Sequence, residues 1–242
     1  MFRRYHHFFL AFSVGVFGVI TYSLLNESIE HAGMSLKTLL FVLGGFLVPY
    51  ILIKRLLPAD HHHHDTDSPH SHAHTAVDGR SVIISDSIHN IADGLLLVSA
   101  LSISTVLGIG AAISIMIHES IQELSEFFVL KEAGYSDSRA LRLNFIASSS
   151  ILIGITIAAL SLATDSVEGI VHGVAASAFI FVLMWDLIPA LLHTKRISTL
   201  VGYTFSALFG ALLIFTISTI VPHEELHEHG ESTTVAEDHE HH

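Results

Sequence analysis

Long apolar stretches separated by short polar segments dominate the chain. Each of these stretches is close to the length, about 20 residues, that a helix needs to cross the hydrocarbon core of a bilayer. They cover residues 8–25, 36–57, 81–102, 105–130, 143–163, 170–192 and 197–221. The pattern therefore predicts an all-α polytopic membrane protein, built as a helical bundle of seven transmembrane helices.

The third predicted span carries a row of polar residues. Asp86, His89 (or Asn90) and Asp93 are spaced by three or four residues, so they share one face of a helix. A charged or polar side chain at bilayer depth is costly and usually faces a cavity, a partner or an ion path. We therefore expect this helix to line a polar interior.

The fourth predicted span has a second polar edge, within the segment "ISIMIHESIQELSEFFVL". His118, Gln122 and Glu126 fall on one stripe of the helix, and Glu119 and Glu123 lie beside it. The remaining residues of the segment are apolar or serine. This helix, too, has one polar edge and an apolar back.

The two polar edges are expected to meet. At about 1.5 Å per residue, His89 lies roughly 12 Å from the cytoplasmic face and His118 roughly 10 Å from it. The predicted metal site consists of His89, Asn90, Asp93, His118, Glu119 and Gln122. The predicted metal pathway toward the cytoplasm consists of Asp86, Glu123 and Glu126. Imidazole and carboxylate suit Zn²⁺, Fe²⁺ and related divalent ions. The alternative is a polar network that only holds two helices together. Such a network usually has fewer ionisable and amide groups than these two helices carry.

The distribution of basic residues predicts the orientation. With the N-terminus in the cytoplasm, every Lys and Arg except Lys37 falls on the cytoplasmic side. Cytoplasmic loops of membrane proteins carry an excess of Lys and Arg. We therefore expect an N-in, C-out topology.

Composition narrows the function classes. The chain has no cysteine, which excludes disulfide scaffolds and thiolate metal sites. Lys and Arg total only 11, which argues against a nucleic-acid partner. Much of the net charge of −12 comes from the C-terminal tail.

Two segments are unusually rich in histidine. The first is predicted to be a cytoplasmic metal-buffering loop, with His61, His62, His63, His64, His70, His72 and His74. The second is the tail at 223–242, in which His alternates with acidic residues and which is also expected to be disordered. A purification tag is the alternative for the tail.

The sequence predicts five divisions of the chain. They are 1–57 (two helices), 58–80 (His-rich loop), 81–132 (motif-bearing helices), 133–222 (three helices) and 223–242 (extracytoplasmic tail).

The polar motifs resemble those of the ZIP (Zrt-, Irt-like protein) family of divalent metal transporters. "SDSIHNIADG" is similar to the family's fourth-helix signature, and "HESIQELSEFF" to its fifth-helix signature. The resemblance implies a ZIP-like fold that lacks the peripheral first helix. It also implies a binuclear or elongated metal site and alternating access by sliding of the motif-bearing helices. Zn²⁺ or another divalent cation would be the transported substrate, moving into the cytoplasm, and no cofactor is expected.

Three departures from the family pattern affect the site. Gln122 stands where many members have His or Glu, and an amide oxygen is a poorer Zn²⁺ ligand than imidazole. Ser120 and Ile121 replace the usual hydrophobe–proline pair, so the helix is expected to break less sharply there. The span at 143–163 has no carboxylate, so one of two metal positions is expected to be weak.

Other polar residues lie near the ends of the spans. Glu27, Glu30 and His31, at the outer end of the first span, either attract cations at an entrance or belong to an ordinary solvated loop. We expect His172, Asp186 and His193 to be structural or interfacial.

Two other function classes compete with transport. "HESIQ" is one residue away from the HExxH motif of zinc proteases, but Gln122 replaces the second His ligand. A metal sensor or storage protein would use the His-rich segments.

We expect a non-enzymatic multi-pass protein of the plasma or inner membrane. Its expected partners are divalent metal ions, the lipid bilayer and a second copy in a homodimer, and no nucleic acid.

Overall fold

The computed structural model describes residues 6–56, 79–164, 167–192 and 196–220, which are helical apart from short turns and ends. Its elements are α1 (His6–Ala32), α2 (Leu36–Leu56), α3 (Gly79–Ile103), α4 (Thr105–Glu132), α5 (Asp137–Ser148), α6 (Ile151–Leu162), α7 (Glu168–Val182), the π-helix η3 (Leu183–Leu187), α8 (Ile188–Leu192) and α9 (Ile197–Ile220). The His-rich loop and tail lie outside the described residues.

The described residues form seven segments that are long and apolar enough to cross a membrane. α5 and α6 form one of them, and α7, η3 and α8 form another. This confirms the predicted all-α bundle of seven spans, whereas the orientation stays a prediction. Large apolar side chains cover the outside of the bundle, as for Leu160 and Phe205, because lipid rather than water is their surroundings.

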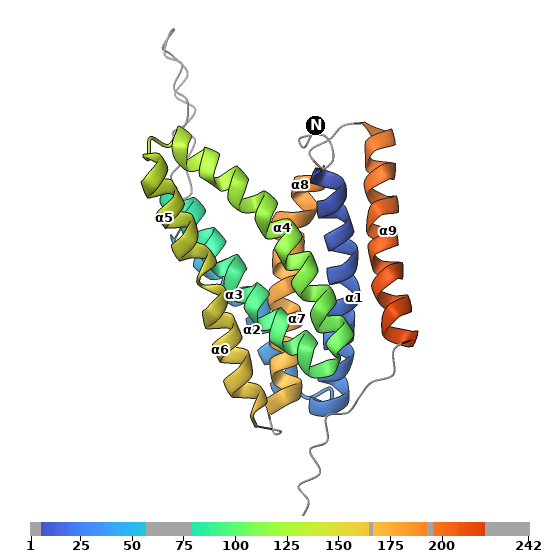
Figure 1. Cartoon of the computed structure of the whole chain (residues 1–242). Coiled ribbons are helices and arrows are strands. Elements are labelled where there is room, and N and C mark those ends of the chain that lie inside the picture. Colours follow the sequence, from blue (N-terminus) through green and yellow to red (C-terminus); the bar gives the residue numbers. More distant parts are fainter. Residues whose placement is uncertain (1–5, 57–78, 165–166, 193–195, 221–242) are drawn as a thin grey trace, which may run out of the picture.

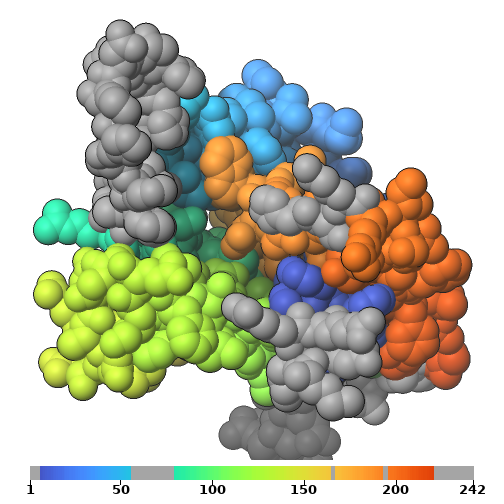
Figure 2. All heavy atoms as spheres, turned by 90° about the horizontal axis from the view of Figure 1, so that it is seen from above, coloured from blue at the N-terminus to red at the C-terminus, as the bar shows by residue number. Residues whose placement is uncertain are grey.

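The helices pack as two groups, which Figure 1 shows side by side. In the first group, α3 packs against α4, α5 and α6. In the second, α1 packs against α7 and α9, and α2 packs against α7. Seen from the end that carries the start of α1, the green helices of the first group occupy one side and the blue and orange helices the other (Figure 2). Contacts of α1 with α4 and of α3 with α7 join the groups.

Two helix irregularities fall next to the polar helices. Pro189 has no backbone N–H, so the carbonyl four residues before it loses its usual partner. The N–H of Ile188 instead bonds the carbonyl of Leu183, five residues earlier, and a π-helical turn results. Between α5 and α6, the hydroxyl of Ser149 bonds the carbonyl of Phe145, a pattern that often bends helices. By contrast, α4 continues through Ser120 without a break, as the missing proline predicts.

Close packing of α3 on α6 depends on two facing glycines. A Cβ on Gly94 would lie 2.2 Å from the carbonyl oxygen of Ile151, and one on Gly154 would lie 2.1 Å from that of Ile91. Only glycine, which has no side chain, allows the backbones of α3 and α6 to come this close. This contact sets the distance between α3 and α6.

Gly154→Ala is expected to lower the free energy of unfolding by roughly 1–3 kcal/mol, because the methyl group pushes two backbones apart. Gly44→Ala is the matched control, since a Cβ there meets nothing within 4 Å. Thermal unfolding of the purified protein in detergent measures both. Equal melting temperatures for the two variants would contradict the close approach of α3 and α6.

Candidate metal centre

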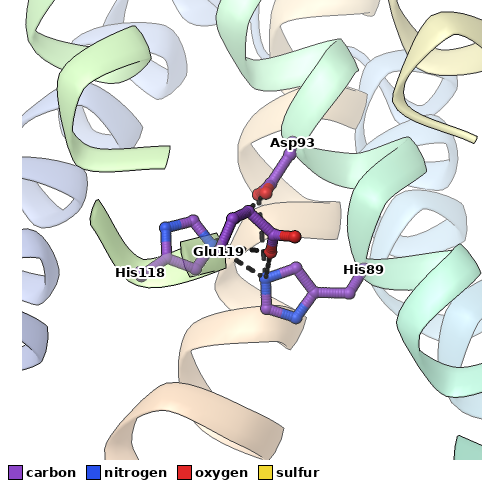
Figure 3. Close-up of side chains that lie close together, drawn as sticks. All are labelled: His89, Asp93, His118 and Glu119. Atoms are coloured by element: carbon purple, nitrogen blue, oxygen red, sulfur yellow. Dashed lines mark hydrogen bonds and ion pairs between the residues drawn. The ribbon is translucent and has the colours of Figure 1, made fainter. Parts of the chain in front are cut away.

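Four of the predicted site residues converge between α3 and α4. His89, Asp93, His118 and Glu119 each offer a ligand atom, and these atoms all lie within 4.8 Å of one another (Figure 3). His89 and Asp93 are one turn apart on α3, and His118 and Glu119 are neighbours on α4. The short connection at Ser104 makes the two helices antiparallel neighbours, so both pairs meet at one depth.

The spacing of these atoms fits the coordination shell of a small divalent ion. The Nε2 atom of His118 lies 3.3 Å from Asp93 Oδ2, 3.2 Å from Glu119 Oε1 and 3.1 Å from His89 Nε2. The Nε2 atom of His89 lies 3.6 Å from Glu119 Oε1 and 3.8 Å from Asp93 Oδ1. Ligands held about 2.0 Å from a tetrahedral Zn²⁺ are separated by about 3.3 Å. The four groups therefore need only small shifts to surround such an ion.

The two imidazole rings are fixed by their outer nitrogens. His118 Nδ1 lies 2.9 Å from the carbonyl oxygen of Ser114, and His89 Nδ1 lies 3.0 Å from Asp186 Oδ2. Both partners accept hydrogen bonds, so each Nδ1 carries a proton and donates. The lone pairs of both Nε2 atoms then point at the same place. Two such lone pairs repel one another unless a cation or a proton lies between them.

The two carboxylates of the cluster are also buried and need a cationic partner. Asp93 is fully buried, and the side chain of Glu119 is 13% exposed. Within the described segments, no hydrogen bond of normal geometry satisfies the carboxylate oxygens of Asp93 or of Glu119, and the Nε2 atom of His118 lies 3.3 and 3.2 Å from them. Buried carboxylates need a cationic partner or a metal. The composition and the geometry of the cluster thus make it a candidate cation site.

Asp186 is the site residue that the sequence analysis missed. It lies in η3, and its hydrogen bond to His89 joins the second helix group to the first. Its side chain is half exposed, whereas that of His89 is only 4% exposed. A carboxylate that holds the outer nitrogen of a ligating His fixes the ring and raises its basicity. Pro189 is the one sequence signal of an irregular helix near Asp186, but it does not by itself predict the π-helical turn that shifts the register there.

Asn90 and Gln122, the other two predicted ligands, make their closest hydrogen bonds outside the four-residue cluster. The amide of Asn90 donates to the backbone and side-chain oxygens of Asp86, each at 3.1 Å. The amide of Gln122 donates to Asp86 Oδ1 at 3.0 Å and to Glu126 Oε1 at 3.1 Å. These four residues form a second cluster, the inner cluster, one turn closer to the predicted cytoplasmic end.

Glu123 leaves the predicted pathway and faces α5. Its carboxylate accepts a hydrogen bond from the hydroxyl of Ser148, and its carbonyl accepts one from Asn144 at 2.9 Å. Its role in the structure is therefore to join α4 to α5. Asn144 and Ser148 are polar residues of the predicted span at 143–163, and both serve this contact.

The predicted entrance residues lie at the far end of α1. His31 contacts both the carbonyl and the carboxylate of Glu27 at 3.2 Å, and Asn26 donates to Glu30 at 2.8 Å. His31 and Glu30 are exposed. None of them lies in the four-residue cluster. Their role in attracting cations at an entrance stays a prediction.

Aromatic rings close another side of the cluster. Phe17 of α1 sets its edge against the ring of His118, with 5.1 Å between centroids. Phe179 of α7 packs on Phe17, with 4.6 Å between centroids. Both phenylalanines are fully buried. The second helix group thus contacts the cluster through Phe17.

The chain has relatives among known proteins. Residues 55–218 match the family model described as ZIP Zinc transporter. Zinc transporter ZIP4 of Mus musculus is 31% identical over 114 residues, which are 47% of this chain and 17% of that protein. Zinc transporter ZIP10 of Danio rerio is 33% identical over 113 residues, which are 46% of this chain and 13% of that protein. Metal cation symporter ZIP8 of Homo sapiens is 26% identical over 147 residues, which are 56% of this chain and 32% of that protein. The chain thus spans less than a third of the length of each of these relatives.

Asp186→Leu is expected to weaken Zn²⁺ binding by about 10–100-fold, because His89 loses the group that orients its ring. Titration calorimetry on the purified protein in detergent measures the affinity. Met184→Leu is the control, since it alters the same π-helical turn at an exposed position away from His89. Unchanged affinity in Asp186→Leu would contradict the orienting role.

Proposed function

The chain belongs to the ZIP zinc transporter family, and we propose that it carries divalent metal cations, Zn²⁺ foremost, across a membrane into the cytoplasm. The observation that carries this proposal is the cluster of His89, Asp93, His118 and Glu119 inside a seven-span bundle. A buried set of two imidazoles and two carboxylates without donors selects a borderline divalent cation. Iron, cadmium and manganese are further candidate substrates.

Alternating access is the mechanism that the helix grouping supports best. The ligands of the four-residue cluster all belong to the first helix group, so they can move together as α3 and α4 move. Asp186 and Phe17 belong to the second group and contact the cluster from outside it, and Phe179 packs behind Phe17. A shift of one group against the other would therefore change what covers the ion without dismantling its ligands.

Release toward the cytoplasm is supported by the inner cluster. Asp86 and Glu126 continue the line of acidic groups beyond His89 and His118. We propose that an ion leaving the four-residue cluster meets these carboxylates and then the His-rich loop at 58–80, which buffers it. Glu27, Glu30 and His31 would attract cations at the opposite end, where the bundle presents acidic groups to solvent.

We infer a transporter rather than a protease. A catalytic zinc of the HExxH kind needs an imidazole where Gln122 stands. The amide of Gln122 instead donates to Asp86 and Glu126, away from the four-residue cluster.

Purified protein in liposomes is expected to take up Zn²⁺, and His89→Ala or Asp93→Ala is expected to abolish that uptake, because each removes a ligand from the four-residue cluster. A Zn²⁺-sensitive dye inside the liposomes measures the flux, and the same assay with Cd²⁺, Fe²⁺ and Mn²⁺ gives the selectivity. Ser120→Ala is the control, since this exposed hydroxyl next to Glu119 bonds only the carbonyl of Met116 among the contacts described. Undiminished flux in both site variants would refute the site assignment.

Gln122→His is expected to raise the ratio of Zn²⁺ to Mn²⁺ uptake severalfold, because imidazole favours Zn²⁺ and is a better ligand for it than an amide. The competition assay in liposomes measures this ratio. Hydrolysis of an unfolded protein substrate is measured in parallel, and none is expected. Gained hydrolysis with no change in uptake would favour the protease instead.

A further inference from the structure

A fully buried histidine lies far from the four-residue cluster, at the end of the bundle that is predicted to face outward. His172 lies four residues into α7 and is 0% exposed. Its Nε2 atom lies 3.0 Å from the hydroxyl oxygen of Ser102 on α3. The sequence analysis treated His172 as structural, and nothing in the proposed function uses it.

The hydroxyl of Ser102 has one hydrogen and two acceptors within reach, the carbonyl of Ser99 at 2.9 Å and Nε2 of His172 at 3.0 Å. When that hydrogen goes to the carbonyl of Ser99, the contact with His172 is a donation from Nε2–H to the hydroxyl oxygen. The Nε2–H form of the ring is the one considered below. In the neutral ring the other nitrogen, Nδ1, then carries a free lone pair.

The lone pair of Nδ1 is buried and unused within the described segments. No described group donates a hydrogen bond to it. A buried acceptor left in this state costs about 1–3 kcal/mol. An apolar residue of the same size would avoid that cost, so a ligand for Nδ1 explains why the position holds a histidine.

Two buried hydroxyls that also lack a hydrogen-bond partner among the described residues lie on the helices around His172. Ser28 on α1 and Ser99 on α3 are buried, and neither hydroxyl has a partner among the described residues. Ser28 faces α7 directly, since a Cβ on Gly173 would lie 2.5 Å from its Oγ atom. Ser99 is one turn from Ser102 on α3. We call His172, Ser28 and Ser99 the outer cluster.

The outer cluster lies between the predicted entrance and the four-residue cluster. On one side, a Cβ on Gly169, one turn from His172, would lie 2.9 Å from the Cβ of His31. On the other side, Phe179 is two turns along α7, and Phe17 lies on the same buried face of α1 as Ser28. Phe17 in turn contacts the ring of His118, and Phe179 packs on Phe17.

We propose that His172 is a cation ligand at a transit site, which takes a borderline divalent ion with Nδ1 while the hydroxyls of Ser28 and Ser99 replace part of its water shell. This inference rests on the proposed function and adds a second binding position to it. Imidazole binds Zn²⁺ and similar ions, whereas Mg²⁺ and Ca²⁺ prefer oxygen. The outer cluster has no carboxylate, so it binds weakly and releases the ion, as a position along a conduction path must.

Nitrogen NMR on the full chain with ¹⁵N-labelled histidine tests the site directly. The difference from a His172→Gln spectrum identifies the His172 signals. We expect the Nε2–H form, and we expect the Nδ1 signal to move when Cd²⁺ is added, also in a His89→Ala/His118→Ala background. The Nδ1–H form, or an Nδ1 signal that Cd²⁺ leaves in place because the group bonds an ordered water only, would overturn the proposal.

Uptake into liposomes provides the functional test. His172→Phe, which keeps the ring but removes the nitrogens, is expected to raise the KM for Zn²⁺ roughly tenfold at similar Vmax. Inhibition by excess Mg²⁺ should increase in the same variant. Ser102→Ala is expected to change KM less, because Nδ1 remains. Equal KM values for wild type and His172→Phe would refute the transit site.

A matched control separates lost packing from a lost ligand. Ser206→Ala removes another interhelical hydrogen bond, from Ser206 to the carbonyl of Phe8, at a position outside the path. It is expected to leave KM unchanged. If the wild-type protein takes up no divalent ion, the proposed function fails. If His89→Ala abolishes uptake while His172→Phe behaves like Ser206→Ala, only the transit site fails.

Discussion

The burial of charge in an apolar bundle is the constraint on which the structure depends. Asp93 and Glu119 lie among helices whose outer faces are apolar, and neither has a hydrogen-bond donor within the described segments. Water cannot compensate them there, and isolated carboxylates at such depth are strongly unfavourable. Among the described residues, the side chains within ion-pair distance of both carboxylates are His89 and His118. A cation held by all four groups would therefore stabilise the site.

Several features of the helices serve that constraint. The glycine pair on α3 and α6 lets the first helix group pack closely, which keeps α3 at a fixed register beside α4. The π-helical turn before Pro189 brings Asp186 to the outer nitrogen of His89. The carbonyl of Ser114 does the same for His118 from within α4. Both rings are therefore held from behind, and only their Nε2 atoms are left for an ion.

Hydropathy and helical spacing predicted much of this from the sequence. The seven spans follow from apolar length, and the pairing of His89 and Asp93 with His118 and Glu119 follows from helix spacing and depth. The same reasoning placed Asn90 and Gln122 in one site with them, although both turn to Asp86. The depth of a polar residue along its helix does not determine which of two nearby groups its side chain contacts. Side-chain hydrogen bonds determine that choice. Asp186 could not be placed, because a π-helical turn shifts a register that regular periodicity assumes constant.

Ligand charge grows along the predicted inward direction. The outer cluster offers one imidazole and two hydroxyls, and the four-residue cluster offers two imidazoles and two carboxylates. Beyond it, Asp86 and Glu126 share the amide of Gln122, whose hydrogens lie between carboxylate oxygens where a cation would otherwise lie. Asp86 Oδ2 and Glu126 Oε2 have no hydrogen-bond partner among the described residues, so these are the oxygens left for an ion. Because the amide of Gln122 occupies the other two oxygens, the inner cluster would hold an ion less tightly than two free carboxylates. A path that ended in two free buried carboxylates would trap its ion, and the amide of Gln122 would weaken that trap.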